Sequence, residues 1–146
     1  MMTEVREYLE ASRRFRQMTR AYGPVLIVED DRCIARLLKH LVMMQGLKAK
    51  TVATAEDAIT YIEENHGEIR CVILDLHLKD GEGETVVNFI ETQHSMVPYV
   101  IHTCDWEATK SITKKYPRAA IYKKGESMML LMEALGFDGS KYCNAG

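Results

Sequence analysis

Short apolar runs alternate with amphipathic stretches from residue 25 onward, and this alternation restricts the fold more than any other feature of the chain. The runs at 25–28 and 71–74 are apolar throughout, which is typical of strands buried on both faces. A strand followed by a helix, repeated five times, predicts parallel strands joined by right-handed crossovers. We therefore expect an α/β fold with a doubly wound, five-stranded parallel sheet and helices on both faces. The expected strands are residues 25–28, 49–53, 71–74, 99–102 and 120–122.

The stretches between these runs have the spacing of amphipathic helices. Residues 31–45 place apolar side chains three and four positions apart, and Gly46 stands where such a helix would end. Thr54 is placed to cap the next helix, with Asp57 three residues later. Residues 80–83 read as a loop. Further helices are expected after this loop, at 105–114 and at 126–135.

The sequence pattern divides the chain into three parts. Residues 1–23 form an N-terminal helical extension, residues 24–136 carry the strand and helix pattern, and residues 137–146 form a frayed tail. The extension predicts a helix over 3–21 with an apolar stripe that needs a covering surface. That surface belongs to the same domain, to a second copy of the chain or to a partner protein, and the last helices offer another route to a homodimer. The stripe consists of Val5, Tyr8, Leu9, Phe15 and Met18.

Length and composition exclude several classes of protein. The chain has 146 residues, the size of one domain, and its net charge of −2 excludes a strongly basic nucleic-acid binder. Its apolar runs are far too short to span a membrane, and its start lacks the pattern of a secretion signal. Its four cysteines have no metal-binding spacing. We therefore expect a cytoplasmic protein with reduced thiols that binds neither nucleic acid nor membrane.

Polar residues follow the predicted strands at the points where the strands end. Glu29 and Asp30 follow the first strand, Asp75 the third, Thr103 the fourth and Lys124 the fifth. In a doubly wound sheet these ends meet at one edge, where reactive groups gather. Clustered carboxylates repel one another, and their hard oxygens suit Mg²⁺, while a lysine suits a phosphoryl oxygen. The set indicates Mg²⁺-dependent phosphoryl transfer to a carboxylate.

Four segments of the sequence resemble the receiver domain of response regulators, the family that serves two-component signalling. They are Val-Leu-Ile-Val-Glu-Asp-Asp at 25–31, Val-Ile-Leu-Asp-Leu-His-Leu-Lys-Asp-Gly-Glu-Gly at 72–83, Pro-Tyr-Val-Ile-His-Thr at 98–103, and Lys124. Each motif is weak alone, but the four in this order and at strand ends are highly specific. The resemblance covers about residues 24–136 and implies a flavodoxin-like sheet with strand order 2-1-3-4-5.

The resemblance also implies a role for each residue of the site. Asp75 is the implied phosphoacceptor, and Glu29 and Asp30 are implied to hold Mg²⁺ together with it. Thr103 is implied to sense the phosphoryl group by a hydrogen bond, and Lys124 to pair with it. The implied donor is a sensor histidine kinase or a histidine phosphotransfer protein. The chemistry is limited to self-catalysed phosphoryl transfer and autodephosphorylation, so the protein is not expected to be an enzyme in the wider sense.

Three positions depart from the family pattern. Lys79 stands where the family usually has a proline in the loop after the phosphoacceptor, and Gly125 replaces the usual proline after the lysine. Ile121 occupies the usual place of the switch aromatic, with Tyr122 one residue later. The sequence therefore supports the chemistry of the site better than the usual conformational switch.

Three neighbours of the site have open or minor roles in the sequence. Asp31 is either a helix cap or a metal contact. His77 either touches the mouth of the site or is a solvated loop residue. Cys104 is expected to pack beside the phosphoryl pocket.

The resulting functional hypothesis is a stand-alone receiver, because only about ten residues follow the last predicted helix. Its output would pass to a downstream protein by direct contact or by phosphorelay. The alternative is a pseudo-receiver that acts as an unphosphorylated protein-interaction module. A phosphatase of the haloacid-dehalogenase type is less favoured, because that family needs an aspartate two residues after its nucleophile and His77 stands there.

Overall fold

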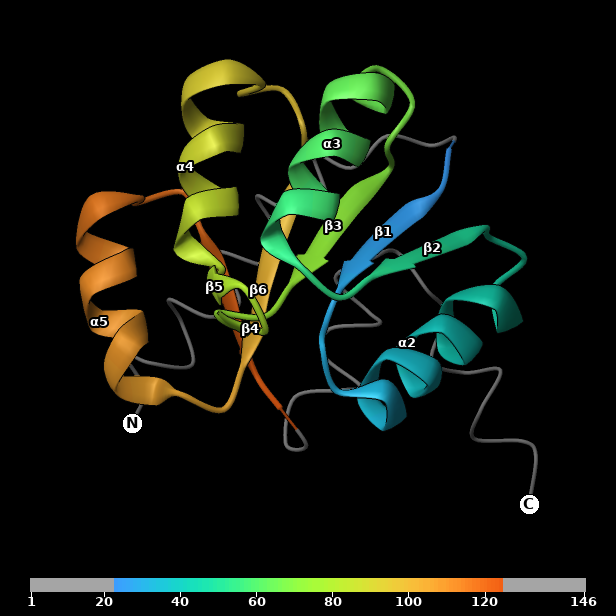
Figure 1. Ribbon diagram of the computed structural model, residues 1–146, viewed down its shortest axis with the longest axis horizontal. Coiled ribbons are helices and arrows are strands. Elements are labelled where there is room, and N and C mark those ends of the chain that lie inside the picture. The colour runs from blue at the N-terminus through green and yellow to red at the C-terminus, as the bar shows by residue number, and fades with distance from the viewer. Residues whose placement is uncertain (1–22, 125–146) are drawn as a thin grey trace.

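The computed structural model describes residues 23–124, in which the predicted alternation of strands and helices is present (Figure 1). The main sheet contains β1 (Val25–Val28), β2 (Ala49–Val52), β3 (Cys71–Leu74), β6 (Tyr99–Thr103) and β7 (Ala120–Lys123). The helices are α2 (Arg32–Met44), α3 (Ala55–Asn65), α4 (Glu84–Gln93) and α5 (Trp106–Lys115). A small antiparallel hairpin pairs β4 (His77–Leu78) with β5 (Gly81–Glu82).

The main sheet is parallel at every strand pair, with the order β2-β1-β3-β6-β7. Counted over these five strands the order is 2-1-3-4-5, so the predicted flavodoxin-like, doubly wound sheet is confirmed. The order of the chain reverses between β1 and β3, which makes the carboxyl ends of these two strands the topological switch point. Ligands of doubly wound proteins bind at this point.

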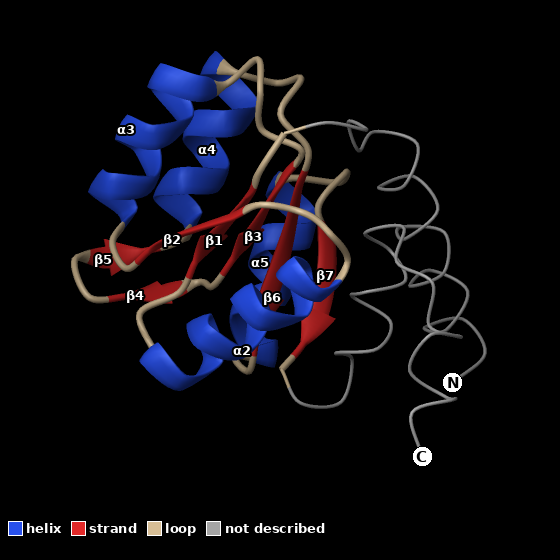
Figure 2. Ribbon diagram, turned by 90° about the vertical axis from the view of Figure 1, so that its right-hand side faces the viewer, coloured by secondary structure: helices blue, strands red, loops and turns tan. Residues whose placement is uncertain are grey.

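Helices cover both faces of the sheet, with α3 and α4 on one side and α2 on the other (Figure 2). Residues of β1 and β3 are at most 1% exposed, which explains why both strands are apolar throughout. Successive residues of a strand point to opposite faces. Leu26 thus packs in the core beneath α3, α4 and α5, whereas Val25 and Ile27 pack in the core beneath α2.

Local signals in the sequence set the ends of the first two described helices. The Asp31 carboxylate accepts hydrogen bonds from the backbone N–H groups of Cys33 (2.9 Å) and Ile34 (3.1 Å), so this residue caps α2. Gly46 adopts a positive φ of 80° just beyond α2. The Thr54 hydroxyl accepts from the Asp57 N–H (3.1 Å) and caps α3 as predicted.

The segment expected to be a loop at 80–83 differs from the prediction, because part of it forms the β4–β5 hairpin. The Asp80 carboxylate accepts hydrogen bonds from the N–H groups of Ala55 (2.8 Å) and Glu56 (3.0 Å), which closes the hairpin against the start of α3. Gly83 lies so close to the Asp75 carbonyl that a Cβ at this position would clash with it. The hairpin is therefore held directly beside the end of β3.

The predicted terminal elements lie outside the described residues. These are the extension with its helix over 3–21, Gly125, the helix at 126–135 and the tail at 137–146. Within residues 23–124, no helix is long and apolar enough to cross a membrane.

The three described cysteines differ in exposure. Cys71 is buried, and burial raises the pKa of its thiol to about 12. Cys33 and Cys104 are exposed. The expectation that Cys104 packs beside the site is wrong, because the chain leaves β6 at Thr103 and the next side chain faces solvent.

Candidate functional site

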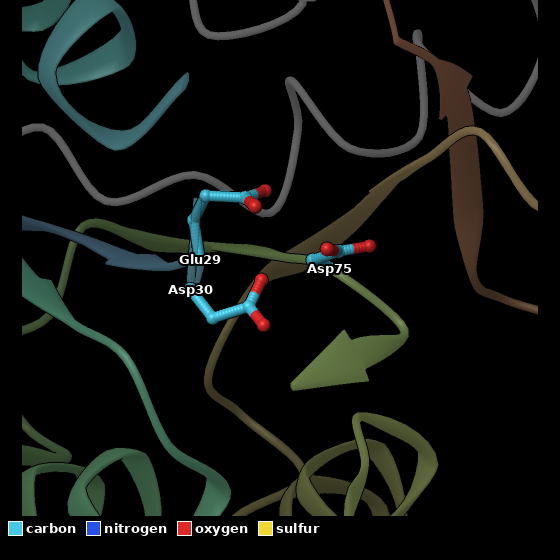
Figure 3. Close-up of side chains that lie close together, drawn as sticks. All are labelled: Glu29, Asp30 and Asp75. Carbon is cyan, nitrogen blue, oxygen red and sulfur yellow. The ribbon is translucent and has the colours of Figure 1, made fainter. Parts of the chain in front are cut away.

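Three carboxylates meet at the carboxyl ends of β1 and β3 (Figure 3). Glu29 and Asp30 directly follow β1 and Asp75 directly follows β3, and one oxygen of each lies within 4.8 Å of the others. Glu29 and Asp75 are buried, at 4% and 5% exposed, and Asp30 is half-buried. Within residues 23–124, no other group of three or more acidic, histidine or cysteine side chains is close enough to hold a metal ion.

The Lys124 ammonium is the positive charge bonded to this group. Its Nζ lies 2.9 Å from Glu29 Oε2 and 2.9 Å from Asp75 Oδ2, and its side chain is only 13% exposed. The Lys124 N–H also donates to the Thr103 carbonyl (3.0 Å), which continues the β6–β7 ladder and fixes the lysine at the strand end. Lys123 follows the alternation to the other face and is exposed. The structure therefore brings Lys124, rather than Lys123, to the carboxylates.

The pKa of Glu29 reflects its burial and its interactions with Lys124 and Asp75. Burial raises the pKa of Glu29 most and the charge of Asp75 adds to this, while the Lys124 contacts lower it, and the net result is a pKa of about 7. Burial lowers the pKa of Lys124, but its bonds to Glu29 and Asp75 raise it by more, so the ammonium stays charged. The site thus keeps an excess of negative charge that a divalent cation would neutralise. Its hard oxygen ligands match the preference of Mg²⁺.

Thr103 ends β6 next to the site and is fully buried. Its Oγ1 accepts a hydrogen bond from the Asp105 N–H (3.1 Å), and its own O–H hydrogen is left to donate. Asp105 in turn caps α5 by accepting from the Ala108 N–H (3.0 Å). The hydroxyl is therefore held by the turn between β6 and α5.

One contact of this turn was not predicted from the sequence. Nε2 of His77 lies 2.6 Å from Asp105 Oδ2, which joins the loop after Asp75 to the loop after Thr103. The hydrogen bond to Asp105 raises the pKa of His77. In the sequence, each of the two residues stands two places after a predicted site residue: His77 after Asp75, and Asp105 after Thr103. This spacing alone does not show that their side chains form a hydrogen bond. His77 thus lies at the mouth of the site, although its side chain is still 52% exposed.

The residues around the expected switch position lie on different faces of β7. Ile121 is half-buried and packs with the core beneath α3, α4 and α5, on the face to which Thr103 also belongs. Tyr122 is 1% exposed in the core on the other face. Because the tyrosine lies on the opposite face, it does not replace the missing aromatic beside Thr103.

Comparison with known proteins decides the family. The family model of the response regulator receiver domain matches residues 25–126. The chain belongs to this family. Receiver domains act in two-component signalling, interact with histidine kinases or phosphotransfer proteins, use Mg²⁺ at an acidic pocket and are generally not true enzymes.

Solved receiver domains share the fold of this receiver. A signal receiver domain from Vibrio parahaemolyticus is 25% identical, with a TM-score of 0.66, and the match covers 86% of this chain and 98% of that chain. A CheY-like receiver domain from Methanospirillum hungatei is 22% identical, with a TM-score of 0.68 and coverage of 80% and 92%. A receiver domain from Clostridium thermocellum is 20% identical, with a TM-score of 0.69 and coverage of 78% and 91%. No curated protein matches the sequence.

Proposed function

We propose that this receiver accepts a phosphoryl group on Asp75 from a sensor histidine kinase or a histidine phosphotransfer protein. One observation carries the proposal: at the switch point of the sheet, two buried carboxylates share the Lys124 ammonium and a third carboxylate lies beside them. Such a group favours binding of a divalent cation and then of a phosphoryl group. A site that served only to stabilise the fold would have no need of the excess charge.

Each residue has a definite task in this proposal. An Asp75 oxygen attacks the phosphorus of the donor phosphohistidine, and the P–N bond breaks with its electron pair passing to the imidazole. Glu29 and Asp30, with Asp75, would hold Mg²⁺, which supplies charge neutralisation at the phosphoryl oxygens. Lys124 pairs with a phosphoryl oxygen, and the Thr103 hydroxyl donates a hydrogen bond to another.

The finer assignments of partner and place belong to the same proposal. The phosphorylated protein passes the signal to a downstream protein by direct contact or by phosphorelay, in the cytoplasm and without nucleic acid or membrane. We assign the receiver domain to residues 24–136, and we propose that residues 3–21 or the last helices contribute to a homodimer. Light scattering on the full chain and on a chain beginning at Gly23 tests the contribution of the extension.

Incubation with acetyl phosphate and Mg²⁺ tests the central step. We expect the intact protein to gain the mass of one phosphoryl group, and EDTA or Asp75→Asn to abolish the gain. Asp31→Asn is the matched control, because this neighbouring carboxylate caps α2 instead. If wild-type protein stays unlabelled by acetyl phosphate and by a panel of histidine kinases, the pseudo-receiver alternative replaces this proposal. Labelling of Asp75→Asn at another residue would contradict the assignment of Asp75.

A further inference from the structure

His102 is the one buried histidine of residues 23–124, and the proposed chemistry gives it no role. It lies in β6 and is 1% exposed, and neither of its ring nitrogens has a hydrogen-bond partner among the described residues. Most buried polar side chains have at least one partner, because burying an unpaired group is unfavourable. An imidazole kept in this position therefore calls for an explanation other than packing.

The register of the sheet places His102 beside the phosphoacceptor. Leu74 of β3 pairs with Ile101 of β6, so the next residues along, Asp75 and His102, are neighbours across the two strands. Val100 packs in the core beneath α2, and His102, two residues later on the same strand, points to that same face. Asp75 likewise comes two residues after Ile73, which packs in the same core, so its side chain points to this face as well. The imidazole and the Asp75 carboxylate therefore extend from one face of the sheet.

The Lys124 side chain must cross the end of β6 on this face. Lys124 follows β7, and its ammonium bonds to Asp75 after β3 and to Glu29 after β1. β6 lies between β7 and β3 in the sheet. Ala120 of β7 faces the core beneath α2. Every second residue of a strand points to the same face, so Lys124, four residues later, lies on the same side of the sheet as His102.

The electrostatic surroundings agree with this placement. Burial lowers the pKa of His102 most and the Lys124 charge lowers it too, while the Asp75 charge opposes the shift, and the net result is a pKa of about 4. His102 is therefore neutral at neutral pH, with one N–H donor and one nitrogen that accepts. A neutral acceptor takes a hydrogen bond from an ammonium without competing with carboxylates for a divalent cation.

We propose that His102 is a positioning residue, whose free ring nitrogen accepts an N–H of Lys124 when Glu29 and Asp75 turn from the ammonium to a divalent cation. The inference rests on the proposed function, because both present partners of Lys124 are proposed Mg²⁺ ligands. An ammonium only 13% exposed needs a new acceptor when those partners leave. His102 supplies one on the line between β7 and β3, and so keeps Lys124 over the phosphoacceptor.

The test compares His102→Leu, which fills similar space without nitrogen atoms, with His102→Gln, which retains a donor and an acceptor. Val100→Ala is the matched control, since it alters the same face of β6 two residues deeper. Three measurements are made on the full chain: thermal unfolding, the NMR signals of the Lys124 side chain with and without Mg²⁺, and the rate of labelling by acetyl phosphate. If the leucine variant does not fold, His102→Met replaces it.

We expect His102→Leu to unfold at the same or a higher temperature, because it removes an unpartnered buried group. Its Lys124 signals in Mg²⁺ should differ from those of wild type, and its labelling should be about tenfold slower, with His102→Gln restoring most of both. A leucine variant that matches wild type in the Lys124 signals would overturn the inference. Wild-type protein that fails to label contradicts the proposed function instead, and the Lys124 signals in Mg²⁺ still decide the role of His102.

Discussion

The two ends of the sheet both carry ion pairs that are at least partly buried, but their charges balance differently. At the amino end, the Glu91 carboxylate receives hydrogen bonds from the Tyr99 hydroxyl (2.6 Å) and from Nε of Arg118 (2.7 Å). At the carboxyl end, Glu29 and Asp75 share Lys124, with Asp30 alongside. Within residues 23–124, the first cluster has one anion for one cation, and the second has three anions for one cation.

This difference separates a structural ion pair from a site that binds ligands. Arg118 also lies over the Tyr99 ring at 5.8 Å, so the amino-end cluster joins α4, β6 and the segment before β7 by several contacts. Among the described residues its one carboxylate is balanced by one guanidinium, so no excess charge is left for a ligand to neutralise. The carboxyl-end cluster retains excess charge at the switch point, where a cation and a phosphoryl group would remove it.

The largest expected effect comes from removing the Lys124 ammonium that Glu29 and Asp75 share. In Lys124→Ala we expect phosphorylation by acetyl phosphate to be about 10²-fold slower, as is typical when one preorganised electrostatic stabiliser is lost. Mg²⁺ should bind more tightly, because no ammonium then competes for the carboxylates. Labelling rates and Mg²⁺ titrations followed by Trp106 fluorescence measure the two effects. Lys123→Ala is the control, and a reversed ranking of the two lysines would refute the argument.

Removing the Glu91 carboxylate at the amino end of the sheet should lower the stability of the fold without slowing phosphorylation. Glu91→Ala leaves the Tyr99 hydroxyl and Arg118 without their carboxylate, and we expect it to lower the free energy of unfolding by about 1–3 kcal/mol. Urea unfolding measures this loss, and labelling by acetyl phosphate should be unchanged. Glu63→Ala is the matched control, because Glu63 pairs with His94 at the surface and is 63% exposed. A slower labelling rate in Glu91→Ala would show that the two ends are coupled.

A smaller effect concerns the protonation of Glu29 at the carboxyl end of the sheet. The pKa of Glu29 is raised from 4.5 to about 7, so the folded protein without metal holds a proton between these pH values that the unfolded chain has released. The free energy of unfolding without metal should therefore fall as the pH rises from 4.5 to 7. Mg²⁺ needs the carboxylate, so its binding at pH 6.5 should release part of one proton, and its affinity should rise with pH to about 7.

Calorimetry in two buffers of different ionisation enthalpy measures the released proton. Glu29→Gln should bind Mg²⁺ more weakly and release no proton. Equal proton release from wild type and Glu29→Gln would assign the proton to another group.

The smallest expected effect lies at the mouth of the site. Asp105 raises the pKa of His77 above its ordinary value of 6.5, so the pair stabilises the fold fully below pH 6.5, and this stabilisation is lost as the pH rises through the raised pKa. His77→Ala should thus lower the unfolding temperature slightly at pH 5.5 and not at pH 8.5. His40→Ala, which alters an exposed histidine of α2, serves as the control. An equal loss at both pH values would indicate packing rather than the ion pair.

Much of the fold was predictable because its signals are local. Short apolar runs identified most of the strands, and Thr54 identified the start of one helix. The cap that Asp80 provides for α3 was not predictable, since the residues involved lie far apart in the chain. The exposed position of Cys104 was also missed, because the direction of a side chain beyond a strand end depends on the turn that follows.

The sequence by itself determined which groups reach the carboxyl edge. Parallel strands end at a common edge, so the residues at the carboxyl ends of β1, β3, β6 and β7 had to meet there. The tertiary structure alone decided how those groups are paired: Lys124 with Glu29 and Asp75, His77 with Asp105, and His102 with no partner. Strand periodicity assigns a side chain to a face, but hydrogen bonds form only within about 3 Å, and distances of that size depend on how the whole sheet twists and packs.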